Sequence, residues 1–440
     1  MDRGAVAGEP APPGLGAAVT VRVVHLTGGV PVASVPHAGG VLQRDVTRSL
    51  LEQGTDVLVL APAHRGNRED LPASIAPRTE LPEDWPRRWS PAGIAVRAAH
   101  RLNRWAHGAA LQHAHPPFVA SLLLQRRTRR ALRDADVIDL QWFAQIRLLP
   151  MVRLLAGPRP VIVGTFHDVV SQRIERTASL TPPGKERDRL LTASRRARRE
   201  ERWCGRRLDR SVVLSEKDRD LLLEAGVPAE RITVLAPRIA SRGADAPGGE
   251  HVLPPAGGER AARPVVLFVG YLGRPENRDA VHWLLSEIWP RVRSSMPEAC
   301  LRIVGGGAPD GLHAQIDGTP GATATGFVED LDAEYRGADC CVVPLRDGAG
   351  VKFKTIEALL SGVPTVATTI GAEGVGRRED FVALSDETEG LVAGILAALR
   401  DPERRRHAAE TAERLARLHD PCVFDRTVLS VYATGRSGAR

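Results

Sequence analysis

The chain has 440 residues, of which 43% are hydrophobic and 26% are charged; these are ordinary globular values and exclude wholesale disorder. This length is sufficient for two domains, each with its own core. The net charge of +7 fits anionic partners such as nucleotide phosphates, nucleic acid or acidic lipid headgroups. No apolar run approaches the ~18 residues that span a membrane.

The N-terminal segment and the cysteines indicate the compartment. Residues 1–19 are rich in Ala, Gly and Pro and lack the apolar segment of a signal peptide, so we expect a disordered leader. The five cysteines show neither metal spacing nor an even disulfide framework. This usage favours a reducing cytoplasm.

In the first half of the chain, strand and helix patterns alternate, which predicts a parallel α/β sheet. The clearest helix covers residues 41–53, where Leu42, Val46 and Leu50 recur at i, i+4 and i+8. A second helix is expected at residues 118–133. The expected strands are at 20–26, 56–61, 137–140, 161–166, 211–214 and 232–235. We assign residues 20–239 to an N-terminal, acceptor-side Rossmann-like domain.

A change in composition marks a domain boundary. Residues 240–263 consist largely of Gly, Ala, Pro and Arg, which indicates an interdomain linker. A second αβ series follows, with strands at 265–269, 300–304, 323–327 and 381–384 and helices at 279–293, 387–400 and 402–419. We assign residues 264–408 to a C-terminal, nucleotide-binding Rossmann-like domain. Residues 409–440 are interpreted as a helix and tail that could return to the N-terminal domain.

The most informative stretch lies near residue 350, where a strand, a glycine loop, a short helix and a second strand follow one another. Gly350 lets the backbone approach a ligand closely, and the helix start offers unpaired N–H groups to an anion. Lys352 and Lys354 are two of only four lysines in the chain. Glu357 follows one helical turn later and can accept hydrogen bonds from ribose hydroxyls. The stretch therefore favours a nucleoside diphosphate site, and a buried αβ unit with a solvated basic turn is the alternative.

The helix and strand after this loop read Glu357-Ala-Leu-Leu-Ser-Gly-Val-Pro-Thr-Val-Ala367. The segment resembles the donor-site motif of retaining GT-B glycosyltransferases of family 4 (glycosyl transferases group 1). A Glu-x7-Glu pair is typical of that family, and its second Glu binds the ribose. Here Glu357 matches the second Glu, whereas Ala349 stands at the first. The chain thus resembles a sub-branch with a small residue there and a basic pair before the helix.

The resemblance covers most of residues 20–420 and implies an α/β fold of GT-B architecture, with two Rossmann-like domains facing across a cleft. It implies transfer of a sugar from a nucleotide-diphosphate sugar to a small-molecule, glycan or lipid-linked acceptor. Retention of anomeric configuration, independence of metal ions and the absence of any other cofactor are also implied. On this view Lys352 and Lys354 stabilise charge on the leaving diphosphate, and Glu357 holds the ribose.

Two turns in the N-terminal half match the acceptor side of this family. Gly39 and Gly40 join the first strand to its helix and match a Gly-Gly loop near the acceptor and the donor phosphate, although a plain tight turn explains them equally well. His167 and Asp168 stand at the carboxyl end of a strand, where open α/β sheets bind ligands. A lone His-Asp pair is more often structural. The resemblance implies that His167 contacts the transferred sugar.

Further donor-side candidates follow the C-terminal strands. The family commonly places an arginine where this chain has Tyr271, so Arg274 or Arg278 is a candidate to replace it at the diphosphate. Residues 326–328 follow a later strand, where the family holds the base with backbone groups. The donor-side set is Gly270, Arg274, Arg278, Gly326, Phe327, Val328, Gly350, Val351, Lys352, Lys354 and Glu357.

Several other interpretations of the sequence are weaker or remain open. Phe353 occupies the site of the second glycine of a Walker loop, which argues against a P-loop ATPase. The Asp-x-Asp pairs at 134–136 and 330–332 do not form a recognisable metal site. A nucleotide-sugar epimerase of the same fold remains open, although it needs paired acid and base groups near the sugar. The arginine excess leaves open a non-catalytic anion-binding protein; with 4% aromatic residues, nucleic acid is not an expected partner.

Two arginine-rich segments bear on membrane contact. Residues 195–210 are expected to form a solvated helix. Residues 118–133 are the better candidate for contact, because Leu122, Leu123 and Leu124 precede several arginines. We therefore expect a cytoplasmic protein and leave open a peripheral contact with the inner face of the membrane.

Overall fold

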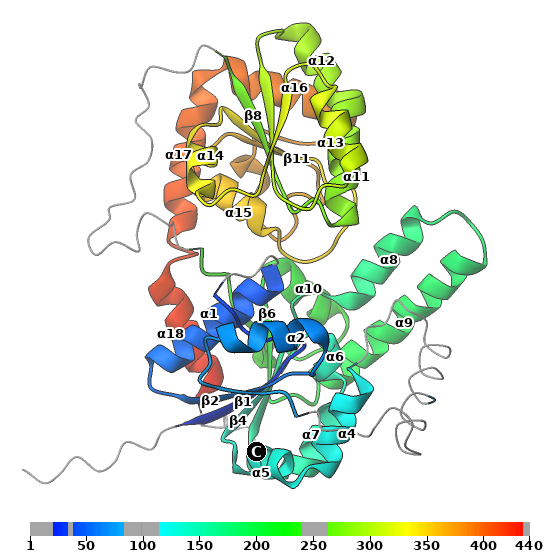
Figure 1. The fold of residues 1–440 in the computed structure, drawn as a ribbon, viewed down its shortest axis with the longest axis vertical. Helices are drawn as coiled ribbons and strands as arrows, with labels where there is room; N and C mark the ends of the chain where they lie inside the picture. The colour runs from blue at the N-terminus through cyan, green and yellow to red at the C-terminus, as the bar shows by residue number, and fades with distance from the viewer. Residues whose placement is uncertain (1–20, 34–37, 83–97, 99–113, 240–262, 434–440) are drawn as a thin grey trace, which may run out of the picture.

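The computed structural model describes residues 21–33, 38–82, 98, 114–239 and 263–433. They form two lobes stacked along the long axis of the molecule, each with a central sheet (Figure 1). The expected leader at residues 1–19 lies outside the described residues. So does the expected linker at 240–263, apart from its last residue.

The N-terminal lobe is built on a seven-stranded parallel sheet of order β3-β2-β1-β4-β5-β6-β7. Its strands are β1 (Arg22–Leu26), β2 (Asp56–Leu60), β3 (Arg78–Glu80), β4 (Val137–Gln141), β5 (Val161–Thr165), β6 (Arg210–Val213) and β7 (Ile232–Val234). Its helices are α1 (Ala38–Glu52), α2 (Arg65–Asp70), α4 (Pro116–Leu124), α5 (Arg126–Asp134), α6 (Phe143–Ile146), α7 (Leu149–Ala156), α8 (Val170–Leu180), α9 (Lys185–Gly205) and α10 (Glu216–Glu224).

The C-terminal lobe is built on a six-stranded parallel sheet of order β10-β9-β8-β11-β12-β13. Its strands are β8 (Val265–Val269), β9 (Cys300–Val304), β10 (Ala322–Gly326), β11 (Cys340–Val343), β12 (Thr365–Ala367) and β13 (Ala383–Leu384). Its helices are α11 (Pro275–Trp283), α12 (Trp289–Ser295), α13 (Asp310–Asp317), α14 (Leu331–Arg336), α15 (Phe353–Leu360), α16 (Thr388–Arg400) and α17 (Pro402–Ala416). Two Rossmann-like halves are therefore present, and the expected α/β architecture is confirmed.

The sequence patterns correspond to burial in the described sheets. Every residue of β4 and of β5 is buried, as expected for central strands covered by helices on both faces. On α1, Leu42, Val46 and Leu50 are each only 1% exposed, so the i, i+4, i+8 stripe faces the sheet as predicted. The carboxyl ends of both sheets point toward the boundary between the lobes.

The single helix expected at residues 118–133 is wrong, because the chain forms α4 and α5 instead. Gln125 between them has an extended backbone, with φ −77° and ψ 122°. Phe118 and Leu122 of α4 and Leu132 of α5 are all fully buried in the same hydrophobic core.

Two other expected helices also differ from the structure. The basic helix expected at 195–210 ends at Gly205, and β6 already begins at Arg210. A side chain at position 205 would clash, because an added Cβ would lie 2.6 Å from Val227. The helix expected at 279–293 contains a π-helical turn (Leu284–Ile288) between α11 and α12. Pro290 follows that turn, and its missing N–H prevents a regular i to i−4 ladder there.

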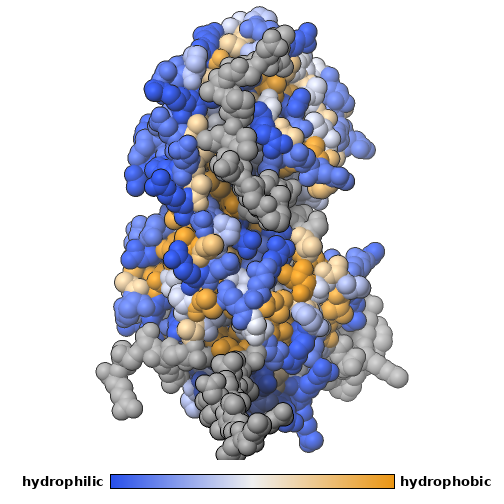
Figure 2. All heavy atoms as spheres, turned by 90° about the vertical axis from the view of Figure 1, so that its left-hand side faces the viewer, coloured by the Kyte–Doolittle hydropathy of each residue, from blue (hydrophilic) through white to orange (hydrophobic). Residues whose placement is uncertain are grey.

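The chain ends on the lobe where it began. After α17 it crosses to the N-terminal lobe, where α18 (Pro421–Tyr432) lies beside α1 (Figure 1). The expected division at residues 408/409 falls inside α17. In Figure 2 hydrophilic side chains predominate on the visible face of the C-terminal lobe, and hydrophobic ones gather below it. None of the described helices is both long and apolar enough to cross a lipid bilayer.

Candidate functional site

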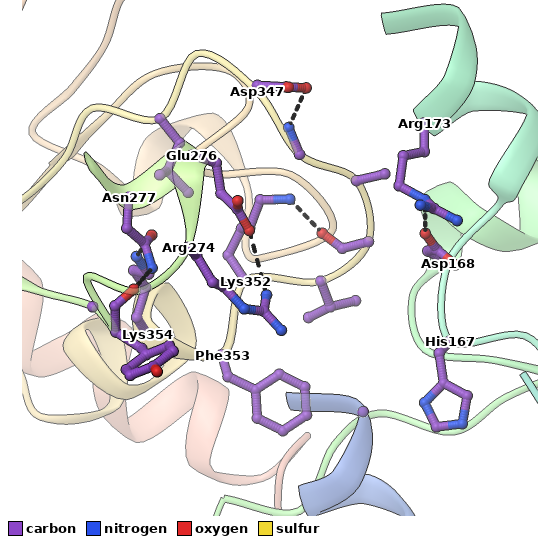
Figure 3. A pocket seen from close by; sticks show the side chains of 18 of the residues that line it. His167, Asp168, Arg173, Arg274, Glu276, Asn277, Asp347, Lys352, Phe353 and Lys354 are labelled. Atoms are coloured by element: carbon purple, nitrogen blue, oxygen red, sulfur yellow. Dashed lines mark hydrogen bonds and ion pairs between the residues drawn. The ribbon is translucent and has the colours of Figure 1, made fainter. Parts of the chain in front are cut away.

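A cavity of about 540 Å³ lies between the lobes, within the usual size range of small-molecule sites. The C-terminal lobe contributes the loop before α15, the first turns of α15 and the loop after β8. The N-terminal lobe contributes the ends of β4 and β5 and the start of α1. Figure 3 shows the charged side chains of the two lobes facing one another across it. The described lining residues are Gly39, Trp142, His167, Asp168, Arg173, Leu214, Gly270, Tyr271, Arg274, Glu276, Asn277, Leu345, Asp347, Gly348, Ala349, Gly350, Val351, Lys352, Phe353, Lys354 and Glu357.

Lys354 lines the cavity in the first turn of α15. Its Nζ donates to Oδ1 of Asn277 over 2.6 Å, and it lies 5.1 Å from the ring centroid of Phe268. Burial lowers the pKa of Lys354 to about 8, and the nearby Lys352 and Arg274 act in the same direction. An anion bound here would therefore stabilise an ammonium group that is otherwise incompletely compensated.

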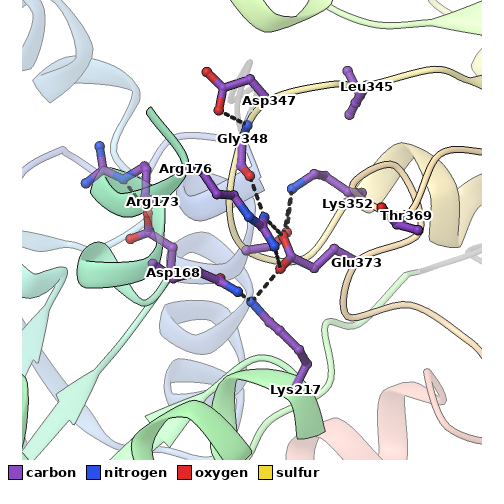
Figure 4. Close-up of polar contacts among 12 residues, drawn as sticks. Asp168, Arg173, Arg176, Lys217, Leu345, Asp347, Gly348, Lys352, Thr369 and Glu373 are labelled. Carbon is purple, nitrogen blue, oxygen red and sulfur yellow. Dashed lines mark hydrogen bonds and ion pairs between the residues drawn. The ribbon is translucent and has the colours of Figure 1, made fainter. Parts of the chain in front are cut away.

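Lys352 belongs to a cluster that joins the two lobes. Its Nζ donates to the carbonyl of Gly350 over 2.8 Å and lies 3.6 Å from Oε2 of Glu373. The same carboxylate receives a two-pronged interaction from Arg176, at 2.5 and 2.6 Å, and Nζ of Lys217 at 3.0 Å (Figure 4). Burial lowers the pKa of Lys352 to about 8; Lys217 and Arg176 reinforce this and Glu373 opposes it. We call Glu373, Arg176, Lys217 and Lys352 the interlobe cluster.

Glu357 lies one turn further along α15, on the lining of the cavity. It neighbours Tyr335, whose hydroxyl donates to the carbonyl of Lys354 over 3.1 Å. Burial raises the pKa of Tyr335 well above its usual range, and the charge of Glu357 adds to the effect. Tyr335 therefore lies next to Glu357, a residue that lines the cavity.

The N-terminal wall is formed by side chains at the ends of β4 and β5. His167 is 9% exposed, and its ring stacks on Trp142 with a centroid distance of 4.3 Å and an interplanar angle of 12°. Trp142 has φ 68°, the single non-glycine residue with positive φ in the described part of the chain. Asp168 pairs with Nε of Arg173 at 2.7 Å. A strained aromatic residue at a cavity wall is characteristic of functional sites.

The structure brings most of the expected site residues together, but not all. Arg278 instead donates to the carbonyls of Leu272 and Gly273, at 3.3 and 2.8 Å, and so holds the loop after β8. Phe327 is 78% exposed. The expected residues on the lining are Gly39, His167, Asp168, Gly270, Arg274, Gly350, Val351, Lys352, Lys354 and Glu357, and those off it are Gly40, Arg278, Gly326, Phe327 and Val328.

Several site residues were missed by the sequence analysis. Asn277 lies in the first turn of α11, two residues after Pro275, and an asparagine there carries little signal of its own. Glu373 and Arg176 are 197 residues apart, so no local pattern could have paired them. Trp142 directly follows β4 and stands two residues after the strand expected at 137–140, and a tryptophan at the carboxyl end of a parallel strand is the signal that could have identified it.

Two family models match the chain, one on each lobe. The model described as "Glycosyltransferase Family 4" matches residues 39–239, and "Glycosyl transferases group 1" matches residues 263–401. The two facing parallel-sheet lobes and the cavity between them define a GT-B protein. The chain belongs to the family 4 (group 1) glycosyltransferases of that fold.

Solved structures share this fold over nearly the whole chain. Alr3699/HepE of Anabaena, solved in complex with UDP and glucose, is 16% identical with a TM-score of 0.62 and covers 94% of this chain and 100% of its own. Sucrose-phosphate synthase from Thermosynechococcus elongatus is 17% identical with a TM-score of 0.64, and the match covers 94% of this chain and 98% of that one.

A curated relative matches a shorter segment. The uncharacterized 44.6 kDa protein in the cps region of Klebsiella pneumoniae is 34% identical over an alignment of 132 positions that covers 28% of this chain. The match spans about a third of the length of that relative, 34%. This match shows sequence similarity over one segment and assigns no activity to the chain.

Proposed function

We propose that the protein transfers a glycosyl group from a nucleoside diphosphate sugar to a small-molecule, glycan or lipid-linked acceptor in the cavity between its lobes. One observation carries the proposal: Lys352, Lys354 and Arg274 meet the N-terminal turn of α15 on one wall of a cavity whose opposite wall holds His167. A set of cations and main-chain amides facing a histidine suits a diphosphate leaving group joined to a sugar.

Each group has a proposed task. Lys354 and Arg274 balance the negative charge that develops on the leaving diphosphate. These protein cations take the role that a metal ion has in other enzymes. Glu357 accepts hydrogen bonds from the ribose hydroxyls. His167 orients the sugar, and we propose transfer with retention of anomeric configuration. Ala349 lines the cavity where the family's first Glu would stand, so this chain must hold the donor sugar with other groups.

The proposal is tested with a panel of UDP-, GDP- and ADP-sugars, measuring release of nucleoside diphosphate and analysing the sugar products. UDP-sugars come first, because structures similar to this chain were solved with UDP. We expect slow hydrolysis of one donor, retained configuration in the released sugar, and faster turnover once an acceptor is supplied. Conversion to an isomeric nucleotide sugar without acceptor would instead identify an epimerase.

Lys354→Ala and Glu357→Gln test the assignment of the site. We expect each to lower kcat/KM for the donor at least tenfold, about 1.4 kcal/mol of transition-state stabilisation. Lys185→Ala is the matched control, since Lys185 is an exposed lysine at the start of α9 and does not line the cavity. Full transfer with unchanged donor affinity in both variants would remove this site from the reaction.

For the cell we propose a cytoplasmic protein that contacts the inner membrane face peripherally. All five cysteines are free, which suits a reducing compartment. Leu123 and Leu124 are 41% and 57% exposed beside the arginine-rich α5, which supports contact with an acidic bilayer. Flotation with phosphatidylglycerol vesicles, but not phosphatidylcholine vesicles, is expected; flotation with neither contradicts the membrane contact.

A further inference from the structure

A chain of buried hydrogen bonds runs from the cavity wall into the core of the N-terminal lobe. Nε2 of His167 lies 2.7 Å from Oε1 of Gln141, and Nε2 of Gln141 donates to Oδ2 of Asp139 over 2.5 Å. Gln141 and Asp139 are both fully buried on β4, and neither lines the cavity. Any effect that they have on a bound substrate is therefore indirect, and His167 is the cavity residue to which Gln141 is hydrogen-bonded.

Asp139 ends this chain as an ionised carboxylate. Its Oδ2 also accepts from the hydroxyl of Tyr432 over 2.7 Å and lies 3.0 Å from Nδ1 of His25, while its Oδ1 accepts from Thr165 over 3.1 Å. Burial alone would raise the pKa of Asp139, but the donors around it, His25 foremost, hold it below its usual value. A carboxylate in this state can only accept hydrogen bonds.

The carboxylate fixes the direction of each bond toward the cavity. Gln141 must turn its NH₂ group to Asp139, because its carbonyl oxygen at 2.5 Å would face a negative charge. The Gln141 oxygen is then left to face His167 and needs a donor. A neutral imidazole satisfies it only when the proton is on Nε2, which makes Nδ1 a hydrogen-bond acceptor.

Packing holds the ring of His167 in that orientation. Trp142 stacks on one face, held by a backbone with φ 68°. Gly39 of α1 approaches the Nδ1 edge so closely that an added Cβ would lie 3.1 Å from it. Gly39 therefore covers Nδ1, which is buried, while His167 and Gly39 both line the cavity. Rotation of the ring would break the bond to Gln141 and the stack together.

We propose that Asp139 and Gln141 are positioning residues that keep His167 in the Nε2-protonated tautomer and hold its ring in one orientation at the cavity wall, where it meets the donor sugar. The role of this positioning in catalysis rests on the glycosyl transfer proposed above. Tyr432 brings α18 into the arrangement, so the last described helix supports a residue at the cavity. No local sequence pattern connects these positions.

The experiment records the imidazole ¹⁵N signals of the full-length protein labelled with [¹⁵N]histidine, at alkaline pH where imidazole is neutral. His167 is assigned by the signals lost in His167→Asn. We expect the pattern of a protonated Nε2 and an unprotonated Nδ1. A protonated Nδ1 in the wild-type protein overturns the proposal, whatever the variants do.

Gln141→Met removes the acceptor at nearly constant volume and leaves His167 in place. We expect both tautomers of His167 to become populated and kcat to fall about 10- to 100-fold, the loss typical when a residue that orients a metal-ligating histidine is replaced. The affinity for free nucleoside diphosphate should stay unchanged. Gln145→Met is the matched control, because Gln145 is another buried glutamine of the same lobe outside this chain of bonds. It should leave the His167 signals unaltered.

The outcomes separate the two proposals. The spectra need no substrate, so an Nε2-protonated His167 in a protein that uses no nucleotide sugar supports the positioning and contradicts the proposed function. Active wild-type protein together with an unchanged His167 spectrum in Gln141→Met contradicts the positioning alone. If Gln141→Met does not fold, the wild-type tautomer still decides.

Discussion

At the scale of single residues, Lys352 and Lys354 connect the site to pH. Both pKa values are lowered from 10.5 to about 8, chiefly by burial. At neutral pH these buried ammonium groups lower the free energy of unfolding. This destabilisation decreases as the pH rises from about 8 toward 10.5, because in that range the folded protein releases protons that the unfolded chain still holds. A bound diphosphate supplies the missing compensation.

We therefore predict that binding of UDP takes up protons above about pH 8, because the bound anion raises the pKa of both lysines. Affinity should fall as the pH increases through this range, since protonation must then accompany binding. Isothermal titration in buffers of different ionisation enthalpy measures the uptake. Lys354→Met should reduce it and Lys185→Met should not; equal uptake in wild type and Lys354→Met would contradict the role of Lys354.

The residues that could be predicted share one property: their partners are local or common to the motif. Lys352, Lys354 and Glu357 occupy one loop and one helical turn, so their common face follows from spacing. Glu373 could not be found this way, because its meaning comes from two cations on the other lobe. The positive φ of Trp142 is equally invisible, since sequence favours that conformation only for glycine and asparagine.

At the scale of elements, the loop before α15 depends on Gly350. This residue has φ 75°, and a Cβ added to it would lie 3.0 Å from the carbonyl oxygen of His167 on the other lobe. Gly326 offers a comparison, with φ 69° and no atom within 4 Å of an added Cβ. The two positions share backbone strain and differ in contact across the boundary.

We predict that Gly350→Ala and Gly326→Ala each destabilise the protein by about 1 kcal/mol through the left-handed backbone. Gly350→Ala alone should also weaken UDP binding at least tenfold, since the new methyl group pushes the loop away from His167. Denaturant unfolding and titration with UDP measure the two effects. Equal losses of affinity in both variants would mean that residues 326–328 hold the nucleotide after all.

The C-terminal helix α18 is the second element whose role is specific. Tyr432 donates its hydroxyl to Asp139, a carboxylate with no exposed surface. We predict that Tyr432→Phe costs about 1 to 3 kcal/mol of unfolding free energy, because a buried charge loses a donor. Ser430→Ala on the same helix is exposed and serves as the control. A loss equal to that of the control would show that the bond contributes nothing to stability.

Regular elements followed from sequence wherever periodicity and burial agree, as in α1 and the central strands. The failures arose where tertiary packing overrides a local pattern. Gln125, with an extended backbone, separates α4 from α5, and α9 ends at Gly205, where an added Cβ would lie 2.6 Å from Val227. Residues 409–440 are predicted as a helix and tail that could return to the N-terminal domain, but their own spacing does not identify α1 as the contact of α18.

At the scale of the whole molecule, the interlobe cluster ties the two domains together. Arg176 on α8 bonds both Glu373 and the carbonyl of Gly348, so one side chain crosses the boundary three times. Glu373 is 7% exposed, and its pKa is held below the usual value because Arg176, Lys217 and Lys352 outweigh the effect of burial. The ion pairs of Glu373 therefore stabilise the protein fully above the usual pKa of a glutamate. This stabilisation is lost only as the pH falls through the lowered pKa of Glu373.

The cluster should therefore control how tightly the lobes close around a donor. In Glu373→Gln three cations lose their shared carboxylate, and removal of one partner of a buried ion pair costs about 3 kcal/mol. We predict a larger radius of gyration by small-angle X-ray scattering, and a donor KM raised at least tenfold with a smaller change in kcat. Glu379→Gln is the matched control, because Glu379 is largely exposed and pairs only loosely with Arg377 at 3.7 Å. A Glu373→Gln protein with wild-type dimensions and wild-type KM would mean that the lobes are held by other contacts, such as the close approach of Gly350 to His167, and that the charges of the cluster are incidental to closure.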